Sequence, residues 1–154
     1  MKLTAPYLKA TLRKIGIRSL LPQRDPFVAV DCLVHYDDRE VVTETLVRAD
    51  SLFTEDGRMT AAGLMENIAQ TCAARIGFRT LYVLGLDKVD IGVIGALRNM
   101  EIHALPLAGQ TLTTRVTVKE EAFGITLVEA SVTSEGRTLA EGEMKIALKN
   151  EDKG

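Results

Sequence analysis

The sequence predicts an α+β fold in which an antiparallel sheet wraps around one long central helix. Residues 59–78, "MTAAGLMENIAQTCAARIGF", are apolar on nearly every side, which is typical of a helix inside a protein. The segments on either side of this stretch alternate apolar and polar residues with the period of two that β-strands have. Strands that follow one another along the chain pair antiparallel, and a curved sheet of such strands can bury the helix.

Length and charge narrow the class of protein. A chain of 154 residues is long enough for one domain with a substantial core, so we expect a single domain over residues 1–154. The formal net charge of -2 argues against a partner that is a nucleic acid or a membrane surface. No apolar run reaches the length that a bilayer needs, and the N-terminus lacks the apolar core of a signal peptide. We therefore expect a cytoplasmic protein.

The two cysteines, Cys32 and Cys72, lie far apart and have no cysteine or histidine at metal-ligand spacing. We interpret both as small buried hydrophobic residues and expect neither a metal site nor a cofactor. A nucleophilic Cys72 would need an activating base, for which His35 and His103 are the available histidines.

The first half of the chain predicts a short helix followed by a hairpin. Leu8, Leu12 and Ile15 have helical spacing, which predicts an amphipathic helix within residues 1–16. The prolines of "LLPQRDPF" stop that helix and begin an extended segment. "FVAVDCLVHY" and "VVTETLVRA" then predict two strands joined by a turn at "DDRE".

The central helix is expected over residues 60–78, with Thr60 as its N-cap and its end near Gly77. The loop before it contains the turn signal Asp56-Gly57. After it, "DIGVIGALRNMEIHA" predicts one long or broken strand, and "QTLTTRVTVKEEA", "FGITLVEASVTSEG" and "RTLAEGEMKIALK" predict three more. This outline is that of the hotdog architecture, although the hydrophobic pattern alone leaves other α+β folds open. Sheet edges and a helix N-terminus that need covering predict a dimer with its sites at the interface.

One carboxylate, Glu66, lies in the middle of the apolar helix. A buried carboxylate without a partner costs several kcal/mol or more, so this residue needs an explanation. It is either an acid–base group of a functional site or a structural partner of Arg75, Arg98 or a backbone N–H across a dimer interface.

Two segments resemble 3-hydroxyacyl-ACP dehydratases of type II fatty-acid synthesis. "LLPQRDPF" with the following "VAVD" resembles the start of that family's fold, and "LMENIAQTCAA" resembles its central helix. Glu66 falls on the family's catalytic carboxylate and Gln70 on the glutamine after it. The chain departs from the family at Gln23, where a histidine is usual, and in the loop before the helix, which lacks the catalytic histidine.

A closer resemblance is to the accessory 3-hydroxyacyl-ACP dehydratases of aryl-polyene and flexirubin-type pigment clusters. "SLFTEDGRMTAAGLMENIAQTCAARIG" and "LRNMEIHALPLAGQTL" carry it. It implies a substrate on acyl carrier protein or coenzyme A, and either a homodimer or a hetero-oligomer with another hotdog subunit.

The resemblance also implies roles at the helix N-terminus. The Ala61 N–H would polarise the thioester carbonyl, Glu66 would be the acid–base group, and Gly63 would let a substrate approach closely. The residues expected to contact substrate are Phe53, Asp56, Arg58, Ala62, Gly63, Met65 and His103. Several residues have ordinary alternatives to a functional role. Asp56 and Arg58 can belong to a solvated turn, His35 and His103 can pack on strands, and Met59, Met65 and Ile68 can pack in the core.

The basic residues near the N-terminus can contact an acidic carrier protein or can simply be solvated; they are Arg13, Lys14, Arg18 and Arg24.

Three functions remain open from the sequence. The first is a 3-hydroxyacyl-ACP dehydratase-like enzyme of fatty-acid or polyene biosynthesis. The second is a non-catalytic hotdog subunit that stabilises an active dehydratase. The third is an acyl thioesterase in which the helix carboxylate activates water or attacks the thioester. The missing loop histidine favours the second and third. The segment "LLPQRDPF" (residues 20–27), hereafter the Leu-Pro segment, favours the first two.

Overall fold

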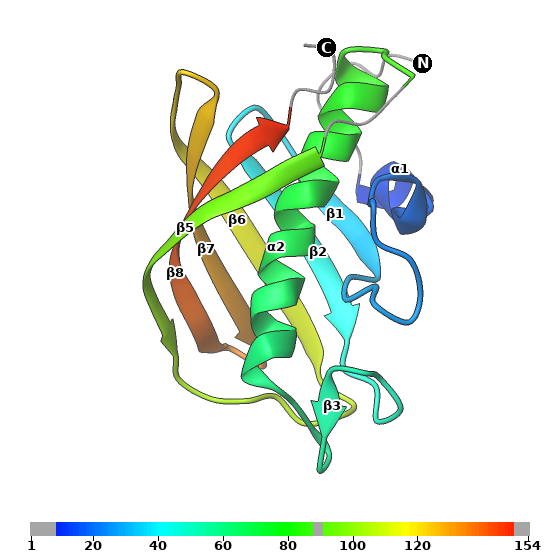
Figure 1. Ribbon diagram of the computed structural model, residues 1–154. Helices are drawn as coiled ribbons and strands as arrows, with labels where there is room; N and C mark the ends of the chain where they lie inside the picture. Colours follow the sequence, from blue (N-terminus) through cyan, green and yellow to red (C-terminus); the bar gives the residue numbers. More distant parts are fainter. Residues whose placement is uncertain (1–8, 88–90, 150–154) are drawn as a thin grey trace.

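The protein is a curved antiparallel sheet with one long helix along its face (Figure 1). The computed structural model describes residues 9–87 and 91–149. The sheet has six strands in the order β1-β2-β6-β7-β8-β5, and every neighbouring pair is antiparallel. The strands are β1 (Cys32–Tyr36), β2 (Glu40–Leu46), β5 (Ile91–Ile102), β6 (Thr111–Ala122), β7 (Ile125–Ser134) and β8 (Arg137–Lys149). The predicted α+β architecture is confirmed.

The core lies between this sheet and helix α2 (Ala61–Phe78). Alternate residues of β6 are buried, which is the pattern of a strand with one face on a core. The helix contributes Leu64, Ile68 and Phe78, none of which is exposed. Phe78 packs against Tyr36 of β1, with 4.6 Å between the ring centroids.

The start and the end of α2 both agree with the sequence prediction of a helix over residues 60–78. Thr60 is the N-cap, and its Oγ1 accepts a hydrogen bond from the Gly63 N–H at 3.1 Å. The α-helix ends at Phe78, one residue after Gly77, and the chain continues as a π-helical turn, η2 (Arg79–Val83), so Gly77 is not a left-handed cap residue. Gly77 is needed for close packing instead: a Cβ at this position would lie 2.2 Å from the Leu20 carbonyl oxygen.

The first strand begins at Cys32, five residues later than predicted. In the preceding segment, the Phe27 carbonyl and both backbone groups of Ala29 bind side chains of α2 rather than a neighbouring strand. The turn to β2 agrees with the prediction, because Asp37 Oδ1 accepts the N–H groups of Arg39 and Glu40 at 2.8 Å each.

The N-terminal helix is shorter in the described residues than the predicted range. Helix α1 covers Lys9–Arg13 and lies beside β1, with Leu12 buried (Figure 1). The rest of the prediction falls partly on residues 1–8, which lie outside the described residues. A 3-10 turn, η1 (Ile17–Ser19), follows.

Strand β5 forms one edge of the sheet. It is one continuous strand, the first of the two predicted alternatives, and its register with β8 shifts between Ile94 and Ala96 and between Arg98 and Glu101. Ile94 and Leu97 are 42% and 47% exposed, which leaves apolar surface along this edge. Across the described ranges, no helix has the length and apolar character needed to span a membrane.

Candidate functional site

The candidate site is built around Glu66 and Gln70, one turn apart on α2. The Gln70 side-chain amide donates to Glu66 Oε1 at 2.8 Å. Gln70 is fully buried, whereas Glu66 is half-buried. The carboxylate therefore lies at the boundary of the core, where one oxygen is held and the group remains reachable.

The segment before β1 fixes the orientation of Gln70. Its Oε1 accepts the Ala29 N–H at 2.6 Å, and its Nε2 also donates to the Phe27 carbonyl oxygen at 2.8 Å. The backbone pattern thus dictates which end of the amide faces Glu66. The end of the Leu-Pro segment and the central helix are thus joined by the Gln70 side chain.

A second buried amide, Asn67, was missed by the sequence reasoning. Its Nδ2 donates to the Ala29 carbonyl oxygen at 2.8 Å and to Thr45 Oγ1 at 3.0 Å. Its Oδ1 accepts from Thr114 Oγ1 at 2.5 Å. A fully buried amide with every group bonded rigidifies its surroundings, and here it fixes α2 to the sheet beside Glu66. The available signal was the position of Asn67 next to Glu66 in an otherwise apolar helix.

The helix N-terminus follows a small hairpin, β3 (Thr54–Glu55) and β4 (Arg58–Met59), at one end of the molecule (Figure 1). Ala61 and Ala62 are exposed in the first turn of the helix. The first N–H groups of a helix have no partner within it, so they can donate hydrogen bonds to an acceptor that approaches this end of α2.

Gly63 has a different role from the one expected. A Cβ at this position would lie 2.8 Å from both Phe53 Cβ and Met59 Cγ. The space in front of this glycine is filled by the loop before the helix, so the close approach is made by the protein itself. Phe53 also accepts the Thr60 N–H on its carbonyl oxygen at 2.8 Å, which holds the loop against the helix start.

The loop residues Asp56 and Arg58 are both exposed. Asp56 and Gly57 have φ values of 53° and 78°, the conformation of a tight hairpin turn. Arg58 Nη1 donates to the Leu105 carbonyl oxygen at 2.9 Å, so its guanidinium ties this hairpin to the chain after β5.

Both histidines have carboxylate partners away from Glu66. His35 Nε2 lies 2.8 Å from Asp37 Oδ2, and His103 Nε2 lies 3.1 Å from Glu141 Oε2. Among the hydrogen bonds and ion pairs of the described residues, Glu66 is joined to Gln70 and to no histidine. One chain therefore supplies a positioned carboxylate without a histidine beside it.

The remaining candidates are distributed between core and surface. Met59 and Ile68 are core residues, whereas Met65 is half-buried near Glu66. Arg75 forms its ion pair with Glu121, not with Glu66. Burial raises the pKa of the Cys72 thiol to about 12, so this cysteine is unsuited to act as a nucleophile.

The basic residues near the N-terminus are mostly paired within the chain. Arg13 pairs with Glu44 and Arg18 with Asp25, while Arg24 donates to backbone carbonyl groups. Lys14 is exposed.

Comparison with known proteins decides the family. The family model of the ApeP-like proteins, described as ApeP dehydratase, matches residues 15–153. The chain belongs to this family. A curated relative of the ApeP-like protein, the 3-hydroxyacyl-[acyl-carrier-protein] dehydratase FabZ of Ruminiclostridium cellulolyticum, is 28% identical over 138 residues, covering 86% of this chain and 94% of that protein.

Solved structures show that the ApeP-like protein has the hotdog fold. The dehydratase heterocomplex ApeI:P from Xenorhabdus doucetiae contains a chain with a TM-score of 0.80 and 17% identity, covering 90% of this chain and 94% of that one. Zebrafish thioesterase superfamily member 2 matches with a TM-score of 0.66 and 15% identity, covering 93% and 99%. A hypothetical thioesterase from Streptococcus pneumoniae, solved with coenzyme A, matches with a TM-score of 0.61 and 17% identity, covering 77% and 84%.

Proposed function

We propose that this ApeP-like protein is the carboxylate-donating subunit of a hetero-oligomeric 3-hydroxyacyl thioester dehydratase of fatty-acid or polyene biosynthesis in the cytoplasm. The observation that carries the proposal is that the site has a positioned carboxylate but no histidine beside it. Glu66 is held by Gln70 in the way a catalytic carboxylate needs, yet both histidines of the chain bind other carboxylates. The missing base then comes from a second hotdog subunit.

The chemistry needs two groups on opposite tasks. A base takes a proton from C2 of the acyl chain, and an acid gives a proton to the hydroxyl that leaves C3 as water, so that a C2–C3 double bond forms. In our proposal Glu66 serves the leaving hydroxyl and the partner's histidine takes the C2 proton. The Ala61 N–H at the start of α2 stabilises the charge that develops on the thioester oxygen.

The exposed edge of the sheet supports assembly. Strand β5 has no neighbour on its outer side within the described residues, and it presents Ile94 and Leu97 to solvent. An edge with apolar side chains is a template for pairing with another chain. The structurally similar chain comes from a dehydratase heterocomplex, ApeI:P, which supports a hetero-oligomer over a homodimer.

A thioesterase is the second candidate. Glu66 is half-buried, so a water molecule can reach it, and a lone carboxylate can act as a base on that water. The thioester C–S bond would then break to give a carboxylate and a free thiol. The fold is shared with thioesterases, which is compatible with this second candidate. Hydrolysis would release the 3-hydroxy acid from its thiol without forming an enoyl product.

The deciding experiment co-purifies the protein with a hotdog dehydratase that has an intact loop histidine. The complex is given a short 3-hydroxyacyl-ACP, and enoyl product and free thiol are followed together. Glu66→Gln is the test variant and Glu55→Gln, an exposed carboxylate on β3, is the control. The partner is also tested with its histidine replaced.

We expect enoyl product from the complex that is lost with Glu66→Gln and with the partner's histidine variant but kept with Glu55→Gln. Enoyl formation that is unchanged by Glu66→Gln would overturn the proposal and indicate a non-catalytic, stabilising subunit. Free thiol released by the protein alone, and lost with Glu66→Gln, would establish the thioesterase instead.

A further inference from the structure

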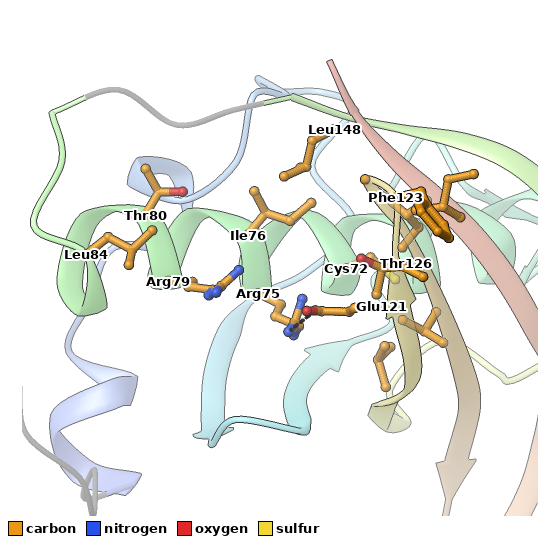
Figure 2. Close-up of a pocket in the computed structure, with 16 residues that line it drawn as sticks. Cys72, Arg75, Ile76, Arg79, Thr80, Leu84, Glu121, Phe123, Thr126 and Leu148 are labelled. Carbon is orange, nitrogen blue, oxygen red and sulfur yellow. Dashed lines mark hydrogen bonds and ion pairs between the residues drawn. The ribbon is translucent and has the colours of Figure 1, made fainter. Parts of the chain in front are cut away.

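A pocket lies at the far end of α2 from the candidate site, between the last turns of the helix and the β6–β7 hairpin (Figure 2). Its volume is about 330 Å³, which falls within the range of pockets that hold small organic ligands. None of the candidate site residues around Glu66 lines it.

The helix geometry separates this pocket from Glu66. Arg75, which lines the pocket, follows Glu66 by nine residues, or roughly 14 Å along the helix axis. Nine residues are two and a half turns, so the two side chains leave the helix on opposite sides. Gln70, one turn after Glu66, binds the segment before β1, whereas Arg75 binds β6. The pocket is therefore a different site.

Arg75 is the unusual residue in this pocket. Its side chain is only 9% exposed, and its Nη2 lies 3.1 Å from Glu121 Oε1. Its buried Nε finds no acceptor within the part of the chain that the structure describes. A guanidinium has five N–H donors, and a buried donor without a partner costs free energy. Arg75 thus has an unused hydrogen-bond donor at an atom that is shielded from solvent.

Glu121 is a replaceable partner for Arg75. Its side chain is 44% exposed, so its carboxylate can turn into water, where solvation offsets the loss of the ion pair. Figure 2 shows Arg75 and Glu121 pointing toward each other inside the pocket. A ligand oxyanion that displaces Glu121 would meet both the Nη2 and the free Nε of the guanidinium.

The rest of the pocket is apolar. Ile76, Val116 and Val128 form part of its wall, and Cys72 is a buried, protonated thiol there. The rim carries exposed apolar side chains: Phe123, at the hairpin tip, is 102% exposed, and Leu148 is 45% exposed. Such walls favour an apolar body, while one buried guanidinium beside a carboxylate favours a singly charged, planar anion over a phosphate.

We propose that this pocket binds an amphipathic monocarboxylate, with its apolar chain along Ile76 and Val128 and its carboxylate on Arg75 in place of Glu121. The proposal is independent of the dehydratase function, because none of its residues belongs to the Glu66 site.

The test measures binding of octanoate to the purified full-length chain by titration calorimetry. Octanol is the matched ligand, since it has the same chain without the charge. Arg75→Met removes the guanidinium at similar length, Glu121→Gln removes the competing carboxylate at an exposed position, and Glu66→Gln reports on the other site. Circular dichroism of each variant checks that it is folded.

We expect wild-type protein to bind octanoate roughly tenfold more tightly than octanol, as a charge-assisted hydrogen bond implies. Glu121→Gln should tighten octanoate binding, Arg75→Met should remove the preference for octanoate, and Glu66→Gln should change neither. Equal binding of octanoate and octanol, no binding of octanoate, or weaker octanoate binding by Glu121→Gln would each overturn the proposal. The Glu121→Gln result stands even if Arg75→Met does not fold.

Discussion

Gln70 joins the carboxylate of Glu66 to the segment before β1. One amide group holds Glu66 Oε1 at 2.8 Å and, through its own oxygen, the Ala29 N–H at 2.6 Å. The position of the Glu66 carboxylate is thereby set by the backbone at Ala29, 37 residues earlier in the chain. Stability and site geometry depend on the same side chain.

Replacing Gln70 by Leu should lower the free energy of unfolding by about 3 kcal/mol, because the buried Ala29 N–H and Phe27 carbonyl lose their partner. Urea denaturation measures this loss. Gln23→Leu is the matched control. The buried Gln23 Oε1 accepts no hydrogen bond from the described residues, so this replacement should lower the free energy of unfolding much less. Similar losses in the two variants would show that the Gln70 hydrogen bonds do not carry the stabilisation.

Asn67→Leu should also destabilise the protein by about 3 kcal/mol, because it leaves Thr45, Thr114 and the Ala29 carbonyl without their shared partner. The informative measurement is a double-mutant cycle with Thr114→Val. Because both residues belong to one network, the double variant should lose less than the sum of the single losses. Additive losses would mean that the two side chains act independently.

The sequence predicted the strands better than it predicted their limits. The last strand, Arg137–Lys149, agrees with the prediction because an alternating pattern between two turn signals leaves little freedom. "FVAV" is β-rich as well, yet it is not a strand, because Gln70 and Asn67 satisfy its backbone groups from the helix. Side chains 38 or more residues away are invisible to a local pattern.

In the candidate site, too, the sequence predicted what depends on local pattern and missed what depends on tertiary contacts. Glu66 and Gln70 were found because a polar residue in an apolar helix is a local signal, and their contact follows from one helical turn. Arg75 lies on the same helix, but its partner Glu121 is on β6, so the pocket that they share depended on the tertiary fold. The helix ends one residue after Gly77, as expected from the tendency of glycine to end helices, but the glycine itself is there because Leu20 approaches it closely.

Gly77→Ala tests that interpretation. In a free helix this change is worth about 1 kcal/mol of stabilisation, but here the new Cβ would lie 2.2 Å from the Leu20 carbonyl oxygen. We expect a net loss of roughly 3 kcal/mol in the free energy of unfolding, from the backbone shift that overpacking forces. Gly16→Ala is the control, because no atom lies within 4 Å of its added Cβ. Thermal denaturation of the pair would refute the packing role if both variants were equally stable.

The two cysteines should differ in how they react with a thiol reagent. Burial raises the pKa of Cys72 to about 12, and the residue is only 4% exposed, so it should stay unmodified in the native protein. Burial also raises the pKa of Cys32, but that residue is partly exposed, so it should react slowly as the pH rises. Mass spectrometry after native labelling should find modification at Cys32 alone, and after denaturation at both. Rapid native modification of Cys72 would mean that its pocket opens readily.

The ion pair of Arg18 and Asp25 makes the Leu-Pro segment sensitive to acid. Hydrogen bonds from Arg18 Nε and Nη2, at 3.0 and 2.8 Å, hold the pKa of the Asp25 carboxyl below its usual range. A carboxyl whose pKa is lower in the folded state adds stability above its unfolded pKa, and this stability is lost as the pH falls through the folded pKa.

Arg18→Gln should therefore raise the pKa of Asp25 toward its ordinary value and reduce the loss of stability in acid that this pair contributes. An NMR titration of the Asp25 carboxyl carbon measures the shift directly. Arg24→Gln is the matched control: Arg24 Nη1 donates to the backbone carbonyl oxygens of Arg18, Leu21 and Gln23. None of these contacts involves the Arg18 guanidinium or the Asp25 carboxyl, so the variant should leave the Asp25 titration unchanged. If Arg18→Gln left the titration where it is in the wild type, the ion pair would not be formed in solution, and another contact would have to hold this segment beside Gln70.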